Sequence, residues 1–252
     1  CCERRGALSM KYLILCLLLL ALPVHADNVY WYGGTGNWND GTTHWSNNSG
    51  NIPDTTHATP AATDDVLIDS LSHTVAYTVT TNTPTCLCKN MTWGNPASGV
   101  PTFAGSTTLA VSGNYSLVSG MTYTRTGSTT FNQSGGTQTI TTNGVGISGT
   151  MSFNGSATYQ LQDNLSTTSV SMFLVSGTFD ANGKTVTVSP SSSLQLLGNN
   201  FNFYNLTLTG PALKTGLLTL AANQTVTNVL KLHIPEKENS NGEESEGEKG
   251  DG

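Results

Sequence analysis

The chain has 252 residues, of which 10% are charged and 37% are hydrophobic, and its formal net charge is -6. So little charge is atypical of a disordered chain, and the 10 scattered Lys and Arg residues exclude the basic surface of a nucleic-acid-binding protein. Between Asp27 and Pro235 the chain has eight aspartates and no glutamate, so this body offers few general acids or bases.

The first predicted element is a leader that covers residues 1–26. Met10 and Lys11 precede an apolar run at 12–22, and residues 24–26 read Val-His-Ala, the small-x-small pattern of a cleavage site. These features are typical of a secretory signal peptide that starts at Met10. The apolar run is too short for a membrane span. We therefore expect a mature chain that is secreted, extracellular or at the cell surface, without a membrane span.

The region 27–100 opens with a cluster of aromatic residues, Tyr30, Trp31, Tyr32, Trp38 and Trp45. Flat aromatic faces with polar edges suit sugar rings, and polar residues flank the cluster. The same residues would also close the open end of a stacked-coil fold, which needs a cap to shield its core. The sequence therefore predicts a cap with the first β coils, and the cap can also be a glycan-binding platform.

Half of the body's aspartates follow within one short span: Asp54, Asp64, Asp65 and Asp69. Calcium binds several oxygen ligands, so these carboxylates are the candidate metal site of the chain. Their spacing matches no EF-hand loop. Turn capping before the apolar stretch 66–68 explains the same residues equally well.

Two cysteines remain after the leader, Cys86 and Cys88. Residues at i and i+2 lie on one face of a strand, where a mutual disulfide would be strained. The histidines of the body show no zinc-binding spacing. We interpret the two cysteines as core or ladder residues and leave their redox state open.

The region 101–235 contains four weak copies of one pattern, a Gly turn before a short β-branched strand. Gly127, Gly155 and Gly183 follow one another at a step of 28 residues. Such units bury their apolar row only when they stack. We therefore predict an all-β, right-handed parallel β-helix with coils of roughly 28 residues or a fraction of that. The alternative is a β-sandwich, because regularly spaced short strands and Asn-Gly turns also build sandwiches.

Two stretches of the repeat region resemble a known class of proteins. Residues 203–210 and 225–232 are similar to the strand repeats of bacterial secreted surface and adhesin-like proteins with a right-handed, pectin-lyase-like β-helix. The stretches 31–38 and 64–69 are similar to the start of such repeats. The resemblance covers most of residues 28–232 and implies location and fold, without fixed catalytic residues.

The last predicted element is an acidic tail at 236–252, which has no aromatic residue and is typical of a disordered segment. An uncapped solenoid end invites edge pairing. We therefore expect the body without this tail to self-associate, or to continue into further repeats.

The sequence contains few side chains that could act as catalytic groups. A glycosidase needs two carboxyl groups beside one bond, and the repeat region offers Asp163 and Asp180. A lyase needs a base near a cation, and Arg125 is the only arginine of the body. We name no catalytic residue and keep a polysaccharide-degrading lyase or glycosidase as the alternative function.

The prediction for function is a secreted structural or adhesive β-solenoid module, whose partners are polysaccharides or surface glycans bound through the aromatic cluster. Calcium is the one cofactor considered. A second alternative is an ice-binding protein, because Thr-x-Thr triplets could form a flat threonine ladder. Such a ladder must recur once per coil, whereas the spacing of the triplets at 122–124, 137–139, 185–187 and 225–227 is uneven.

Overall fold

The computed structural model describes residues 26–233 except 51, 55, 73–74, 95–98, 169–170, 190–193, 199, 210–217 and 221–223. The predicted leader, apart from Ala26, and the predicted acidic tail therefore lie outside the described residues. Strands make up 54% of the structure. The one helical element in the described part is a short 3-10 turn, η1 (Gly41–Thr43).

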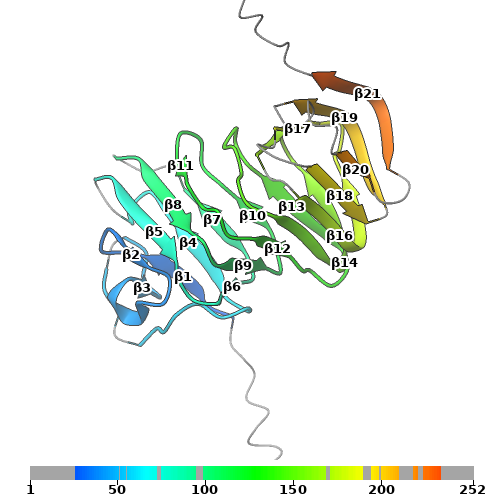
Figure 1. Ribbon diagram of the computed structural model, residues 1–252. Helices are drawn as coiled ribbons and strands as arrows, with labels where there is room; N and C mark the ends of the chain where they lie inside the picture. Colours follow the sequence, from blue (N-terminus) through cyan, green and yellow to red (C-terminus); the bar gives the residue numbers. More distant parts are fainter. Residues whose placement is uncertain are drawn as a thin grey trace, which may run out of the picture.

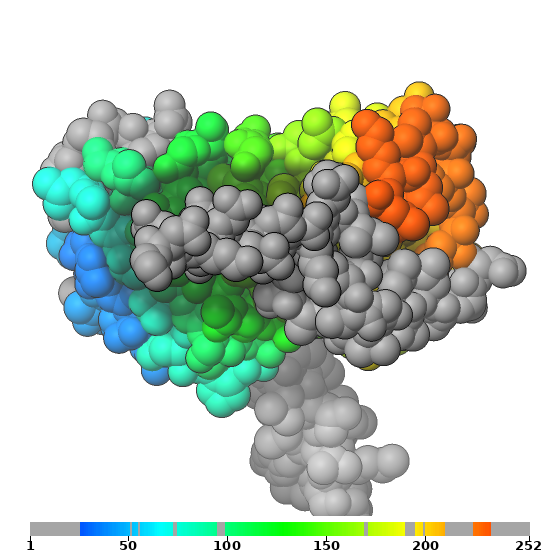
Figure 2. Space-filling view, turned by 45° about the horizontal axis from the view of Figure 1, so that its top comes forward, coloured from blue at the N-terminus to red at the C-terminus, as the bar shows by residue number. Residues whose placement is uncertain are grey.

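The chain winds into stacked parallel coils, a β-solenoid of about 6 turns with roughly 23 residues from one turn to the next. Figure 1 shows the stack running from the blue strand β1 (Asn28–Trp31) to the orange strand β21 (Thr225–His233) at the opposite end. The space-filling view keeps the same order of colours (Figure 2). The predicted solenoid is confirmed, and the parallel pairing excludes the alternative sandwich.

Three ladders of parallel strands run along the stack. The first ladder joins β1, β4 (Asp65–Ile68), β7 (Met91–Trp93), β10 (Tyr115–Ser116), β13 (Thr137–Thr141), the ends of β14 (Met151–Leu161) and β16 (Ser171–Asp180), and the starts of β19 (Phe201–Thr209) and β21. The second ladder joins β6 (Thr85–Cys88), β9 (Thr108–Val111), β12 (Thr129–Phe131), the starts of β14 and β16, β18 (Leu194–Gly198) and β20 (Leu218–Leu220).

The third ladder has two parts. Its early coils contain β2 (Gly36–Asn37), β5 (Tyr77–Thr81), β8 (Pro101–Gly105) and β11 (Thr122–Tyr123). In the later coils the same place in chain order is taken by β15 (Leu165–Thr167), β17 (Thr185–Val188) and the ends of β19 and β21. The chain visits the first, third and second ladders in turn, so each coil has three sides.

Period-two alternation places the core inside the coils. One column of the first ladder runs through Val29, Val66, Met91, Tyr115 and Ile140, none of which is more than 1% exposed. Aromatic rings continue the core through the later coils, with centroids 5.2 to 5.5 Å apart along Phe131, Phe153, Phe179 and Phe201. Outward positions of the later strands carry polar side chains such as Thr187, Asn205 and Thr207, as period-two alternation predicts.

The coil is shorter than the 28-residue step in the sequence. A Cβ at Gly149 would meet the carbonyl oxygen of Gly127, and one at Gly177 would meet that of Gly155, so stacked glycines lie 22 positions apart. Gly127 precedes β12, whereas Gly155 lies within β14, at the next corner of the following coil. The 28-residue step in the sequence therefore joins two different corners of successive coils, which have similar sequences.

The N-terminal end of the stack is closed by the chain itself. Strand β1 pairs in parallel with β4 on one side and antiparallel with β3 (Trp45–Ser46) on the other. β3 lies along the outer edge of β1 at Tyr30 and Trp31, so these two residues are paired on both sides or shielded from a further strand. No helix among the described residues is long and apolar enough to cross a membrane.

Candidate binding surface

The three tryptophans of the N-terminal cluster form the inside of this cap. Trp31, Trp38 and Trp45 are each 0% exposed, and the Trp45 ring packs edge-on against both others, with centroids 4.8 and 5.0 Å away. The His44 ring stacks on Trp31 at 4.7 Å. The indole N–H of Trp45 donates to the carbonyl oxygen of Trp38 at 2.6 Å. This packing agrees with the cap interpretation.

Of the five aromatic residues in the predicted glycan platform, only Tyr30 and Tyr32 have exposed surface, and both are half-buried. A ring with no exposed surface cannot stack on a sugar, so the three tryptophans do not supply a binding face in this structure. The Tyr32 hydroxyl donates to the carbonyl oxygen of Thr42. Sequence reasoning found the cluster but could not tell which of its rings face inward.

Two of the four aspartates of the predicted calcium site, Asp54 and Asp69, act as separate turn caps. Asp54 accepts from the backbone N–H and hydroxyl of Thr56 at 2.8 and 2.6 Å, and these hydrogen bonds lower the pKa of its carboxyl. Asp69 accepts from the backbone N–H of Leu71 at 2.9 Å and from the hydroxyl of Ser49 at 2.6 Å. Both arrangements are the Asx-turn geometry that the sequence offered as the alternative explanation.

The other two aspartates point to different partners. The buried Asp64 accepts from the Ala61 N–H at 2.8 Å, and His57 Nε2 lies 3.9 Å from it. Asp65 accepts from the Asn90 side chain at 2.7 Å. Within residues 26–233, outside the gaps, no group of three or more His, Cys, Asp or Glu side chains is arranged to hold a metal ion. In this part of the chain, therefore, the four aspartates of the predicted calcium site do not form a ligand cluster.

The two aspartates considered for glycosidase chemistry also hold turns. Asp163 accepts from the backbone N–H groups of Thr142, at 2.9 Å, and of Asn143. Asp180 accepts from the N–H of Asn182 at 2.8 Å and from the Gln160 side chain at 3.1 Å. Both carboxylates therefore hold the backbone and side chains of their own or a neighbouring coil.

Arg125 is fully buried and joins neighbouring coils. Its guanidinium donates to the carbonyl oxygens of Thr107 and Ser128 at 2.7 and 2.9 Å and to the hydroxyl of Thr129 at 2.7 Å. It also lies 5.3 Å from the centre of the Phe103 ring. Since the guanidinium is enclosed by these groups, it has no surface to offer a substrate.

The two cysteines are core residues, as interpreted from the sequence. Cys86 and Cys88 are free thiols, 0% and 1% exposed, within the second ladder. Burial raises the pKa of the Cys88 thiol far above its ordinary value of 9.0. A buried thiol with a raised pKa is unreactive, so neither catalysis nor metal binding is indicated.

Polar side chains link the coils in columns on the outside. Asn90 donates to Asp65, and its own amide oxygen accepts from the backbone N–H of Asn114 at 2.6 Å. Asn114 in turn accepts from the N–H of Thr139 at 2.9 Å. Side-chain amides suit this position because each can donate and accept at once.

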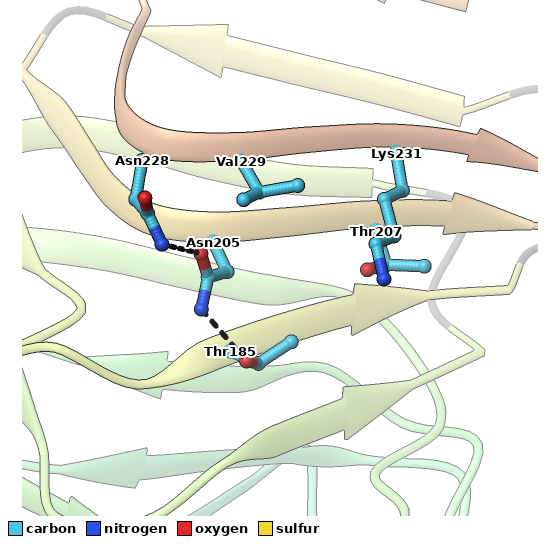
Figure 3. A pocket seen from close by; sticks show the side chains of 6 residues that line it. All are labelled: Thr185, Asn205, Thr207, Asn228, Val229 and Lys231. Atoms are coloured by element: carbon cyan, nitrogen blue, oxygen red, sulfur yellow. Dashed lines mark hydrogen bonds between the residues drawn. The ribbon is translucent and has the colours of Figure 1, made fainter.

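A second column crosses the later coils. Asn228 donates to the amide oxygen of Asn205 at 2.8 Å, and Asn205 donates to the Thr185 hydroxyl at 3.2 Å (Figure 3). The backbone N–H of Thr185 donates to Asn164 at 2.9 Å. This column therefore connects β21, β19, β17 and the start of β15.

A shallow pocket of about 160 Å³ lies along the second column. Figure 3 shows its lining on three neighbouring strands: Thr185, Asn205, Thr207, Asn228, Val229 and Lys231. Thr207 and Lys231 are register partners, so the ammonium group stands next to a hydroxyl row. Hydroxyl, amide and ammonium groups together suit a ligand rich in oxygen atoms.

A larger hollow of about 430 Å³ lies on the earlier coils. It is lined by Ala26, Ala62, Thr63, Lys89, Ser112, Asn132, Gln133 and Ser134. Its lining is also mostly hydroxyl and amide groups, without an aromatic ring.

The Thr-x-Thr triplets do not stack into one flat ladder. Thr185 and Thr187 pair with Asn205 and Thr207, and the next strand carries Val229 and Lys231 at those positions. In β13, Thr137 and Thr139 pair with Thr158 and Gln160. The repeated threonine pair that ice binding needs is thus interrupted at each step in these strands.

Sequence reasoning missed both polar columns. Their members lie 20 to 25 positions apart, whereas the repeat visible in the sequence has a step of 28 residues. The signal was present in the similar tripeptides Asn164-Leu165-Ser166 and Asn205-Leu206-Thr207, which occupy equivalent outward and inward positions two coils apart. In comparisons with known proteins, no family model, curated protein or solved structure matches the chain.

Proposed function

We propose that this protein is a secreted, adhesin-like structural module of the cell surface that contacts polysaccharides through the polar face of β17, β19 and β21. The observation that carries the proposal is the pocket of hydroxyl, amide and ammonium groups on that face (Figure 3). Sugar hydroxyls both donate and accept hydrogen bonds, so a row of such groups complements a glycan chain. The signal-peptide pattern in the leader supports secretion.

A structural role rather than an enzymatic one is supported by how the charged groups are used. Asp163, Asp180 and Arg125 hold turns and neighbouring coils together. A rigid solenoid presents outward polar groups on successive turns, which suits repeated weak contacts with a repetitive polymer.

The test is a pull-down of residues 26–252 with a panel of insoluble polysaccharides. Replacing Thr207 and Lys231 with alanine should weaken binding by about tenfold or more, since two contacts of about 1 kcal/mol each are lost. The matched control is the pair Tyr30→Ala and Tyr32→Ala, which removes the half-buried rings of the originally predicted platform and should leave binding unchanged.

Three results would count against the proposal. They are no binding to any polysaccharide, a loss of binding only in the tyrosine variant, and release of soluble sugars by the unmodified protein. The last result would favour the polysaccharide-degrading alternative.

A further inference from the structure

The apolar core runs out at the C-terminal end of the stack. Leu230 of β21 pairs with Leu206, which is 3% exposed, and Leu232 pairs with Leu208, which is 1% exposed. Leu230 and Leu232 continue these two columns but are 54% and 57% exposed. Both leucines occupy core positions by register. In the coil before, the same positions are covered by β21, whereas in the last coil they form an exposed apolar surface.

At the N-terminal end of the stack, in contrast, the core side chains of the first strand are covered. Val29 and Trp31 of β1 are 0% exposed, and the rings of His44 and of Trp45 in β3 pack on Trp31. Among the described residues, β21 pairs with β19 alone. In Figure 2 its orange atoms form the end of the coloured layers. One end is therefore closed and the other offers both a strand edge and exposed leucines.

The acidic residues 236–252 do not supply an apolar cover. After Ile234 and Pro235, residues 236–252 contain no apolar side chain larger than glycine, with seven acidic and two basic residues. Such a segment cannot bury leucine side chains. A second copy of the chain, in contrast, brings an identical strand edge and an identical pair of leucines.

We propose that two copies of this chain join end to end through the outer edges of their β21 strands. Because only one end of each stack is open, the pairing is a closed twofold dimer in which the two β21 strands run antiparallel. Leu230 and Leu232 of each copy cover those of the other. This interface does not depend on the proposed glycan contact and goes beyond it.

Charge gives the dimer a distinctive salt dependence. The acidic residues 236–252 follow β21 after Ile234 and Pro235, so twofold pairing brings two negatively charged segments to the same end. Salt screens this repulsion. Dimerisation should therefore strengthen as ionic strength rises, and it should strengthen when residues 236–252 are removed.

Sedimentation velocity of residues 26–252 over a wide concentration range tests the proposal. The unmodified chain should form dimers and no larger species. The double variant Leu230→Glu/Leu232→Glu should be monomeric, because four carboxylates would meet in the interface. The matched control is Val175→Glu, which changes a side chain that is 65% exposed in β16 and should leave the dimer intact. Thermal unfolding at low concentration should be alike for all three proteins, since the replaced side chains are more than half exposed.

Cross-linking tests the geometry of the pair. Single cysteines placed in turn along residues 225–232 should give a disulfide between identical positions at one or two sites near the twofold axis. The native Cys86 and Cys88 are buried and do not interfere. The proposal is overturned by a strictly monomeric chain, by dimers that persist in the glutamate variant or vanish in the Val175 variant, or by open-ended chains of the unmodified protein.

Discussion

Buried titratable side chains give this fold a characteristic response to alkaline pH. Burial raises the pKa of the Cys88 thiol and of the Tyr77 and Tyr115 hydroxyls above their ordinary values of 9.0 and 10.0. As pH rises past those values, the unfolded chain releases these protons while the folded chain keeps them. The folded state then binds more protons, so its stability falls with increasing pH.

The expected result is a stable plateau below about pH 9 and a steep loss of stability above it. Each ionising group contributes a slope of up to about 1.4 kcal/mol per pH unit. Urea midpoints measured from pH 7 to pH 11 check this. The variant Cys88→Ala should lose the part of the slope that begins near pH 9, and a midpoint that stays constant to pH 11 would contradict the prediction.

Individual residues also show where prediction from sequence stops. The cluster Trp31, Trp38 and Trp45 was visible as a cluster, and both a cap and a glycan platform followed from its chemistry. All three rings are 0% exposed, and Trp45 reaches its place against Trp31 because β3 folds back antiparallel along β1. That antiparallel return has no local signal in the sequence.

At the scale of the element, glycines set the corners of the coils. A Cβ at Gly127 would overlap the backbone of Ser106 and Thr107 in the coil below, whereas a Cβ at Gly146 meets nothing within 4 Å. Neither glycine has a positive φ, so backbone strain does not contribute at either position. Alanine substitutions at the two positions therefore differ only in whether the added Cβ meets the neighbouring coil.

Gly127→Ala should therefore lower the free energy of unfolding by about 1 to 3 kcal/mol, the usual cost of overpacking. Gly146→Ala is the control and should be neutral or slightly stabilising, because alanine reduces the freedom of the unfolded chain. Urea unfolding of both variants distinguishes the two effects. Equal stabilities would show that the coils can separate at this corner without cost.

The strands themselves were predictable, because β-branched runs alternate inward and outward residues with period two. The length of the coil was not, because β14, β16 and β19 pass from one ladder to the next without a break. A corner inside a continuous strand has the same Gly and Asn residues as a corner between strands. The sequence therefore does not distinguish Gly127 from Gly155, although the two glycines occupy different corners.

At the scale of the whole molecule, the two ends of the stack differ in kind. The N-terminal end is closed by Trp31, Trp38 and Trp45, and the C-terminal end exposes Leu230 and Leu232. A solenoid with one closed end can pair but cannot polymerise. The cap is therefore expected to control the size of the assembly as well as the stability of the chain.

Trp45→Ala tests this link. Trp45 packs against both other tryptophans and lies in β3, the strand that covers β1. Its loss should cost about 3 to 5 kcal/mol of unfolding free energy, as for other large core side chains. It should also loosen β3, so that the edge of β1 becomes available and assemblies larger than dimers form.

Trp93→Ala separates the two consequences. Trp93 is buried to a similar degree, at 3% exposure, and packs against Phe103, but it lies in β7 in the middle of the stack. Its replacement should destabilise the protein by a similar amount and leave the dimer unchanged. If sedimentation shows larger assemblies for both variants, they arise from destabilisation alone. If only Trp45→Ala assembles further, the tryptophan cap is what limits the protein to pairs, because it alone holds a strand across the edge of β1.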